Sequence, residues 1–158
     1  MESKGQLEGR SGLRVSLLGG FDVGVGAIQV PPESWRRRKP ANLLKILALA
    51  SGHRAHREVV LDLLWPELEP AAGGANLRKA IHQARTALDG ASRGAARLIE
   101  FQGDVLSLAS EGLIVDTVCF RSALTAARRS GDVKGYRDVS VSCMLVSHRR
   151  SVSTCSRR

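Results

Sequence analysis

The stretch from Ala75 to Leu88 constrains the fold of this chain more than any other part of its sequence. Its apolar residues recur every three or four positions, and at 100° per residue they fall within about 60° of arc on one side of an α-helix. These residues are Leu77, Ile81, Ala84 and Leu88. The opposite side is polar and holds Arg78, Lys79, His82, Gln83 and Thr86. We therefore expect an amphipathic helix that packs one side against a core and presents the other outward.

Two shorter helices are expected before this one. The first runs from about Ala41 to Ala50, and the second covers Arg57 to Leu64. Trp65-Pro66 should end the second helix, because proline disfavours helical backbone at the residue before it. The segment from Pro70 to Gly74 is expected to be a loop, and its two glycines should weaken the start of the third helix.

Short runs of alternating apolar and polar residues on both sides of the helices predict strands. Those before the helices predict a small antiparallel sheet and are Leu13 to Leu18, Phe21 to Val25 and Ala27 to Val30. Those after the helices predict a hairpin around Gln102-Gly103-Asp104 and are Leu98 to Phe101 and Val105 to Leu108. A flexible basic linker from Ala91 to Arg97 is expected to lead into the hairpin. The order of sheet, three helices and hairpin predicts an α+β fold, a winged helix-turn-helix with the hairpin as its wing.

This order of elements predicts binding to double-stranded DNA. The major groove is about 12 Å wide and admits one helix, whose outer side chains must supply hydrogen-bond donors and acceptors. On the third helix, Arg78 and Lys79 can pair with guanine or phosphate, and Gln83 can pair with adenine. We expect His82 and Thr86 to read bases as well. A net charge of +9 and a pI of about 10.5 agree with a nucleic-acid partner.

A second set of residues is expected to contact the phosphate backbone. A run of four cations precedes the first helix, which must lie against the DNA backbone if the third helix enters the groove. The remaining members lie at the start of the second helix, on the third helix and in the basic linker. The full set is Arg36, Arg37, Arg38, Lys39, Arg57, Asn76, Arg85, Arg93 and Arg97.

Four motifs carry a family resemblance. They are LRVSLLG at residues 13–19, RKPANLLKILA at 38–48, Arg57-Glu58 with LWPE at 64–67, and NLR at 76–78 followed by Arg85 and Ala87-Leu88. Together they resemble the DNA-binding module of the actinobacterial antibiotic-regulatory (SARP-type) activators, which is similar to the OmpR-type winged helix. The resemblance covers about Leu13 to Leu108. It implies a transcription activator that regulates antibiotic biosynthesis.

The sequence after the hairpin resembles the beginning of a further domain. Residues 115–120 read VDTVCF, which is similar to the V-D-x-x-x-F that opens the helical activation domain of this family. A helix is expected from about Val118 to Arg129, and beyond Gly131 the apolar periodicity is lost. We therefore expect a disordered tail at 1–12, the winged helix at 13–110, a partial helical tail that starts the activation domain at 111–131, and a disordered or aberrant tail at 132–158. Truncation or a shifted reading frame would explain the missing remainder of the activation domain.

Other functions find less support in the sequence. His53 and His56 form an H-x-x-H, but no cluster of Cys, Asp or Glu supplies further ligands, so neither a metal nor a cofactor is expected. No catalytic triad or phosphate-binding loop is present, so we do not expect an enzyme. No apolar run is long enough for a membrane span or a signal core, which predicts a cytoplasmic protein. RNA polymerase and a second copy on direct repeats are candidate partners, and a winged helix that binds only proteins is the alternative.

Overall fold

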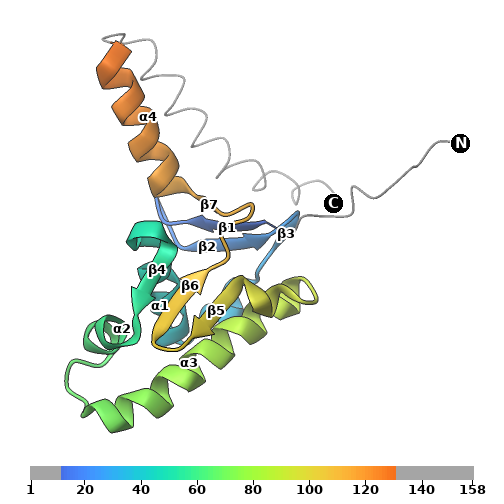
Figure 1. Ribbon diagram of the computed structural model, residues 1–158. Helices are drawn as coiled ribbons and strands as arrows, with labels where there is room; N and C mark the ends of the chain where they lie inside the picture. The colour runs from blue at the N-terminus through green and yellow to red at the C-terminus, as the bar shows by residue number, and fades with distance from the viewer. Residues whose placement is uncertain (1–11, 131–158) are drawn as a thin grey trace, which may run out of the picture.

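The computed structural model describes residues 12–130, which form a mixed α+β structure with two small sheets and four α-helices (Figure 1). One sheet has the strand order β3-β2-β1-β7, and the other has the order β4-β6-β5. The strands are β1 (Leu13–Ser16), β2 (Asp22–Val25), β3 (Ile28–Gln29), β4 (Arg54–His56), β5 (Ile99–Gln102), β6 (Val105–Leu108) and β7 (Ile114–Val115). The helices are α1 (Arg38–Leu49), α2 (Arg57–Leu64), α3 (Pro70–Ala91) and α4 (Asp116–Ser130).

The first sheet covers one end of the helical layer. β1 and β2 pair antiparallel with Val15 opposite Val23, and β1 alternates between buried and half-buried residues, as a strand with one covered face should. β3 continues the antiparallel order, which confirms the predicted N-terminal sheet. The sequence reading missed β7, which pairs parallel to β1 with Val115 opposite Val15. β7 therefore places the segment that follows the hairpin beside β1, the first strand of the fold.

The second sheet is the wing with one additional strand. β5 and β6 form the predicted hairpin, in which Gln102 pairs with Val105 across the turn. β4 adds to the open side of β6, with Ala55 opposite Leu106. This three-residue strand was not predicted. It ties the connection between α1 and α2 to the wing, so the wing is part of the body of the domain.

The core lies where α1, α2 and α3 meet the inner faces of the two sheets. All four residues of the predicted α3 stripe are buried, the most exposed being Ile81 at 4%. They pack with buried leucines and valines from the other helices and the strands. Among the aromatic residues within 12–130, only Trp35 is buried, so the core described by the structure is almost entirely aliphatic.

The start of α3 corrects the sequence prediction, because Pro70 to Gly74 is helical and not a loop. Proline is tolerated in the first turn of a helix, where its missing N–H has no intrahelical partner to lose. Gly73 is buried against α2, and a Cβ atom at this position would lie 3.0 Å from Cδ2 of Leu61. The glycine that weakens the helix locally therefore allows α3 to approach α2 closely.

Two further boundaries differ from the prediction. α1 begins at Arg38, so Pro40 lies inside its first turn instead of before it. The segment from Ala91 to Arg97 is ordered and is not a flexible linker. Gly94 adopts a left-handed conformation (φ 85°), its N–H donates to Oδ1 of Asp89 over 2.6 Å, and a 3-10 helix follows at Ala95–Leu98.

α4 extends the predicted helix of Val118 to Arg129 by a few residues and points away from the body of the domain (Figure 1). The expectation for residues 132–158 lies outside the described residues. Across residues 12–130, no helix has the length and apolar character that a membrane span requires.

Candidate nucleic-acid interface

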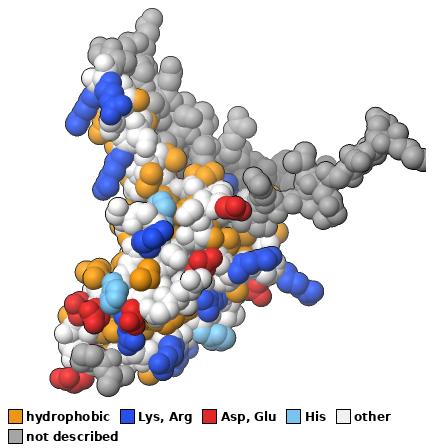
Figure 2. All heavy atoms as spheres, viewed as in Figure 1, with side chains coloured by type: hydrophobic (Ala, Val, Ile, Leu, Met, Phe, Trp, Pro, Cys, Tyr) orange, Lys and Arg blue, Asp and Glu red, His pale blue; other side chains and the backbone are white. Residues whose placement is uncertain are grey.

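The outer face of α3 is an uninterrupted polar surface. Arg78, Lys79, His82 and Thr86 are exposed, and Gln83 is half-buried at the edge of the face. No carboxylate occurs in α3 before Asp89, so the exposed cations are not neutralised along the helix. Lys and Arg side chains gather over the middle of α3 and beyond its C-terminal end (Figure 2). A polyanion can therefore approach this face without meeting an acidic side chain of the same helix.

One flank of α3 lies against the wing and the start of α2. Gly74, Arg78 and Arg85 fall within about 40° of arc on this flank. At Gly74, a Cβ atom would lie 3.5 Å from Nη2 of Arg57, the first residue of α2. Because Arg78 follows Gly74 by one turn on the same flank, it lies at the border between α3 and the wing.

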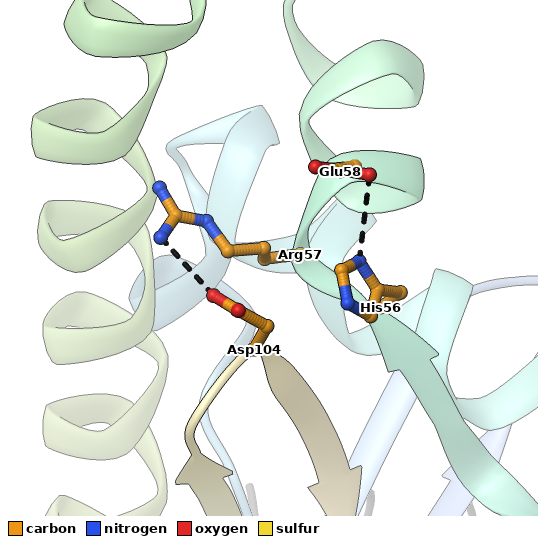
Figure 3. Close-up of polar contacts among 4 residues, drawn as sticks. All are labelled: His56, Arg57, Glu58 and Asp104. Atoms are coloured by element: carbon orange, nitrogen blue, oxygen red, sulfur yellow. Dashed lines mark hydrogen bonds and ion pairs between the residues drawn. The ribbon is translucent and has the colours of Figure 1, made fainter.

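Arg57 connects the wing turn to α2 and reaches toward α3 (Figure 3). Its backbone N–H donates to the carbonyl oxygen of Asp104 over 2.7 Å, and its Nη1 lies 3.2 Å from Oδ1 of the same residue. The pair is partly exposed, so its contribution is positional more than energetic. The contact fixes the wing turn beside α3, and it neutralises the single carboxylate of that turn.

Arg85 has a role inside the domain. Its Nε and Nη2 donate to the carbonyl oxygen of Ile99 over 3.1 and 2.8 Å. This two-donor contact ties the second half of α3 to β5. From the sequence, Arg85 is expected to contact the DNA backbone. In the structure, its guanidinium donates hydrogen bonds to a carbonyl oxygen of the domain itself.

The run of four cations at residues 36–39 spans the start of α1 and divides into two parts. Arg36, Arg37 and Arg38 are exposed, and we call them the basic cluster. Lys39 is exposed as well, but its Nζ donates to the carbonyl oxygen of Leu64 and lies 5.3 Å from the ring centroid of Trp65. Its charge stabilises the C-terminal end of α2, where unpaired carbonyl groups attract cations.

Arg93 and Arg97 lie just after α3 and line an open cleft of about 750 Å³. Arg97 is held by a hydrogen bond from its Nε to the carbonyl oxygen of Gly94 over 3.0 Å. Arg54 on β4 lines the same cleft, and the sequence analysis did not select it. The pairing of β4 with β6 puts Arg54 opposite Ser107 on the exposed face of the wing sheet, and the sequence pattern did not predict this pairing.

The remaining candidates are less central. Asn76 is half-buried on the flank of α3 that faces away from the wing, by its position on the helix. The hydroxyl of Thr86 donates to the carbonyl oxygen of His82 one turn earlier over 2.9 Å, so it can only accept hydrogen bonds from a ligand. The residues predicted from the sequence to contact DNA therefore differ in how far their side chains are available to a ligand.

The two histidines of the H-x-x-H have other partners. Nδ1 of His53 donates to the carbonyl oxygen of Ala48 over 3.0 Å, and Nδ1 of His56 lies 3.8 Å from Glu58 (Figure 3). Within residues 12–130 no three His, Cys, Asp or Glu side chains gather as a metal site would require.

No family model and no curated protein matches this chain. Among solved structures, the chain is similar to Mycobacterium tuberculosis EmbR in complex with low affinity phosphopeptide, with a TM-score of 0.63 and 20% sequence identity. The match covers 85% of this chain but only 35% of that one. The likeness, together with the order of sheets and helices, confirms the predicted α+β winged-helix fold.

Proposed function

We propose that this protein binds specific sequences of double-stranded DNA and regulates transcription, with α3 in the major groove. The observation that carries the proposal is the outer face of α3, where Arg78, Lys79 and His82 are exposed and no carboxylate intervenes. Arg and Lys at such positions pair with guanine O6 and N7, which is the commonest specific contact in the major groove. Gln83 at the edge of the face suits adenine.

The surroundings of α3 supply backbone contacts in this proposal. The basic cluster at the start of α1 is exposed, and none of its three arginines forms an ion pair with another residue of 12–130. Contacts with phosphate require such available cations. The wing turn lies beside the N-terminal half of α3 through the Arg57–Asp104 contact. We propose that the wing follows the neighbouring backbone or minor groove. Lys39 and Arg85 contribute to binding through the positions of α2 and β5.

The family resemblance extends the proposal to partners and setting. We propose that the chain is a cytoplasmic, SARP-type activator that regulates antibiotic biosynthesis genes. A second copy on direct repeats and RNA polymerase are the protein partners that this role calls for.

A DNA-binding measurement with a matched control tests the proposal. DNA sequences would be selected from a random pool, and affinity would be measured by fluorescence anisotropy. Replacing both Arg78 and Lys79 with Ala should weaken specific binding by about 30-fold or more and reduce sequence preference, since good base contacts contribute about 1–3 kcal/mol each. The control replaces Arg128 and Arg129, which are exposed near the end of α4 and carry the same charge. Equal losses in both variants would show that only net charge matters, and the base-reading role of α3 would then be wrong.

Protein binding by the winged helix is the second candidate, and one observation favours it. Val59 and Leu63 lie one turn apart on α2 and are 51% and 62% exposed, so two large apolar side chains lie together on the surface of this helix. This surface is on α2, so it is compatible with DNA binding through α3. Failure of the chain to retain any sequence from the random pool at low salt would favour protein binding alone.

A further inference from the structure

Asp116 joins the start of α4 to the chain that follows β1 through a set of short hydrogen bonds. It is the first residue of α4 and only 6% exposed. Oδ1 accepts the N–H of Leu17 over 2.9 Å, and Oδ2 accepts the N–H groups of Leu17 and Leu18 over 2.8 and 2.9 Å. One carboxylate therefore holds two successive backbone amides of the connection between β1 and β2. Hydrogen bonds to a charged acceptor are roughly twice as strong as neutral ones.

The connection that Asp116 holds carries an aromatic contact at its far end. Phe21, the last residue before β2, packs edge-on against Trp35, with ring centroids 5.5 Å apart and an interplanar angle of 71°. Nζ of Lys45 on α1 lies 4.7 Å from the centroid of the same Phe21 ring. Both contacts fix the β1–β2 connection against the start of the helical layer.

Trp35 stands directly before the basic cluster. It ends the 3-10 helix of Pro32–Trp35, is 9% exposed, and is followed at once by Arg36 to Arg38. Asp116 thus holds Leu17 and Leu18, Phe21 contacts Trp35, and the chain through Gly19 and Gly20 joins these two sets of contacts. This path begins at the first turn of α4 and ends beside the residues proposed to contact DNA phosphates.

We propose that Asp116 is a positioning residue that couples the placement of α4 to the basic cluster, and thereby to DNA affinity. The DNA part of this inference rests on the proposed function. The carboxylate of Asp116 holds the β1–β2 connection through its hydrogen bonds to two backbone amides. Loss of these hydrogen bonds would allow Phe21 to move and would remove its edge contact with Trp35. The parallel pairing of β7 with β1 does not use this side chain, so the fold should survive the substitution.

The first test measures DNA affinity of the full chain carrying Asp116→Asn, with Asp22→Asn as the matched control. Asp22 lies on β2, is exposed, and loses the same charge without touching Leu17 or Leu18. Removal of a negative charge alone should tighten binding to a polyanion. We expect Asp116→Asn to weaken binding by about 2–30-fold, the range of modulation found for residues that touch neither ligand, and Asp22→Asn to leave it equal or tighter. Equal behaviour of the two variants would overturn the proposal.

The second test needs no DNA. The chain has two tryptophans, so Trp65→Phe leaves Trp35 as the sole tryptophan reporter. In that background, Asp116→Asn should increase acrylamide quenching of Trp35 fluorescence at least about two-fold, because a side chain that is nearly buried becomes accessible. The measurement is made at a temperature where far-UV circular dichroism shows both variants folded. Unchanged quenching would overturn the coupling, whatever the DNA result.

A double-mutant cycle separates coupling from independent damage. Phe21→Leu keeps an apolar side chain and the Asp116 hydrogen bonds but removes the aromatic contact with Trp35. If the two residues act through one series of contacts, the double variant should bind DNA no more weakly than the worse single variant. Multiplying losses would show independent effects and contradict the proposal. If the unaltered chain binds no DNA, the proposed function fails, and the quenching of Trp35 still decides whether Asp116 controls this region.

Discussion

At the scale of single residues, side-chain chemistry alone did not distinguish a DNA-contacting cation from a structural one. Lys39 and Arg85 carry the same charge as Arg38 and Arg78, and the sequence assigned all four to contacts with DNA. Lys39 instead meets the C-terminal carbonyl of α2, and Arg85 meets the carbonyl of Ile99. Both acceptors belong to elements remote in sequence, so only the packed structure reveals the contacts.

Arg85→Ala is expected to destabilise the domain. The substitution removes two donors from the carbonyl oxygen of Ile99, a fully buried residue. Hydrogen bonds to charged groups contribute about 1.5–3 kcal/mol, so the free energy of unfolding should fall by about that amount. Urea unfolding measured by circular dichroism would give the value. Arg78→Ala, on the same flank of α3 but exposed, is the control and should change stability by less than about 0.5 kcal/mol; a similar loss in both variants would contradict the structural role of Arg85.

At the scale of elements, the sequence correctly predicted those helices and strands that a periodic pattern within their own residues determines. α2 has the predicted bounds, Arg57 to Leu64, because Trp65-Pro66 ends it and its apolar residues recur at helical spacing. The hairpin is also correct, because alternation and a glycine turn suffice to specify it. β4 and β7 were missed because three and two residues hold too little pattern, and each becomes a strand only by pairing with a distant partner.

The glycines of α3 show how an element depends on its neighbours. Gly90 has no atom within 4 Å of the place where a Cβ would lie, so Gly90→Ala should stabilise the domain by about 0.5–1 kcal/mol through helix propensity. Gly73→Ala gains the same propensity but must displace Cδ2 of Leu61 on α2, which would lie 3.0 Å away. We expect Gly73→Ala to be neutral or destabilising. Thermal unfolding of the two variants tests the pair, and equal stabilisation would mean that α3 and α2 are not in close contact at Gly73.

At the scale of the whole molecule, the fold was accessible from the sequence, whereas the arrangement of the candidate site was accessible only in outline. The apolar stripe of Leu77, Ile81, Ala84 and Leu88 determines which side of α3 faces the core, so the polar face followed directly. The link from Asp116 to Leu17 joins residues 99 positions apart and left no signal in the sequence pattern. Arg54 lines the cleft beside Arg93 and Arg97 because β4 pairs with the distant strand β6, and this pairing likewise left no signal in the sequence pattern.

The distribution of charge over the whole molecule determines how DNA binding should respond to salt. Three exposed cations are proposed to contact the phosphate backbone beside α3, namely Arg36, Arg37 and Arg38. If each meets one phosphate, the affinity should fall with salt with a log–log slope of about −2.7, or about 40-fold between 50 and 200 mM. If the cleft also meets the backbone, Arg93 and Arg97 should steepen the slope to about −4.5.

Replacing Arg93 and Arg97 with Ala decides between these two footprints. Phosphate contacts at the cleft predict that the slope becomes shallower by about 1.8, with the same loss for every DNA sequence. An unchanged slope would place the cleft outside the DNA footprint and confine the interface to α3, the basic cluster and the wing. The matched control is again Arg128 and Arg129, because removing two equal charges from α4 lowers the net charge without altering the number of phosphate contacts. A slope that changes equally in both double variants would mean that binding follows net charge alone, and the proposed footprint of residue-specific contacts would then be wrong.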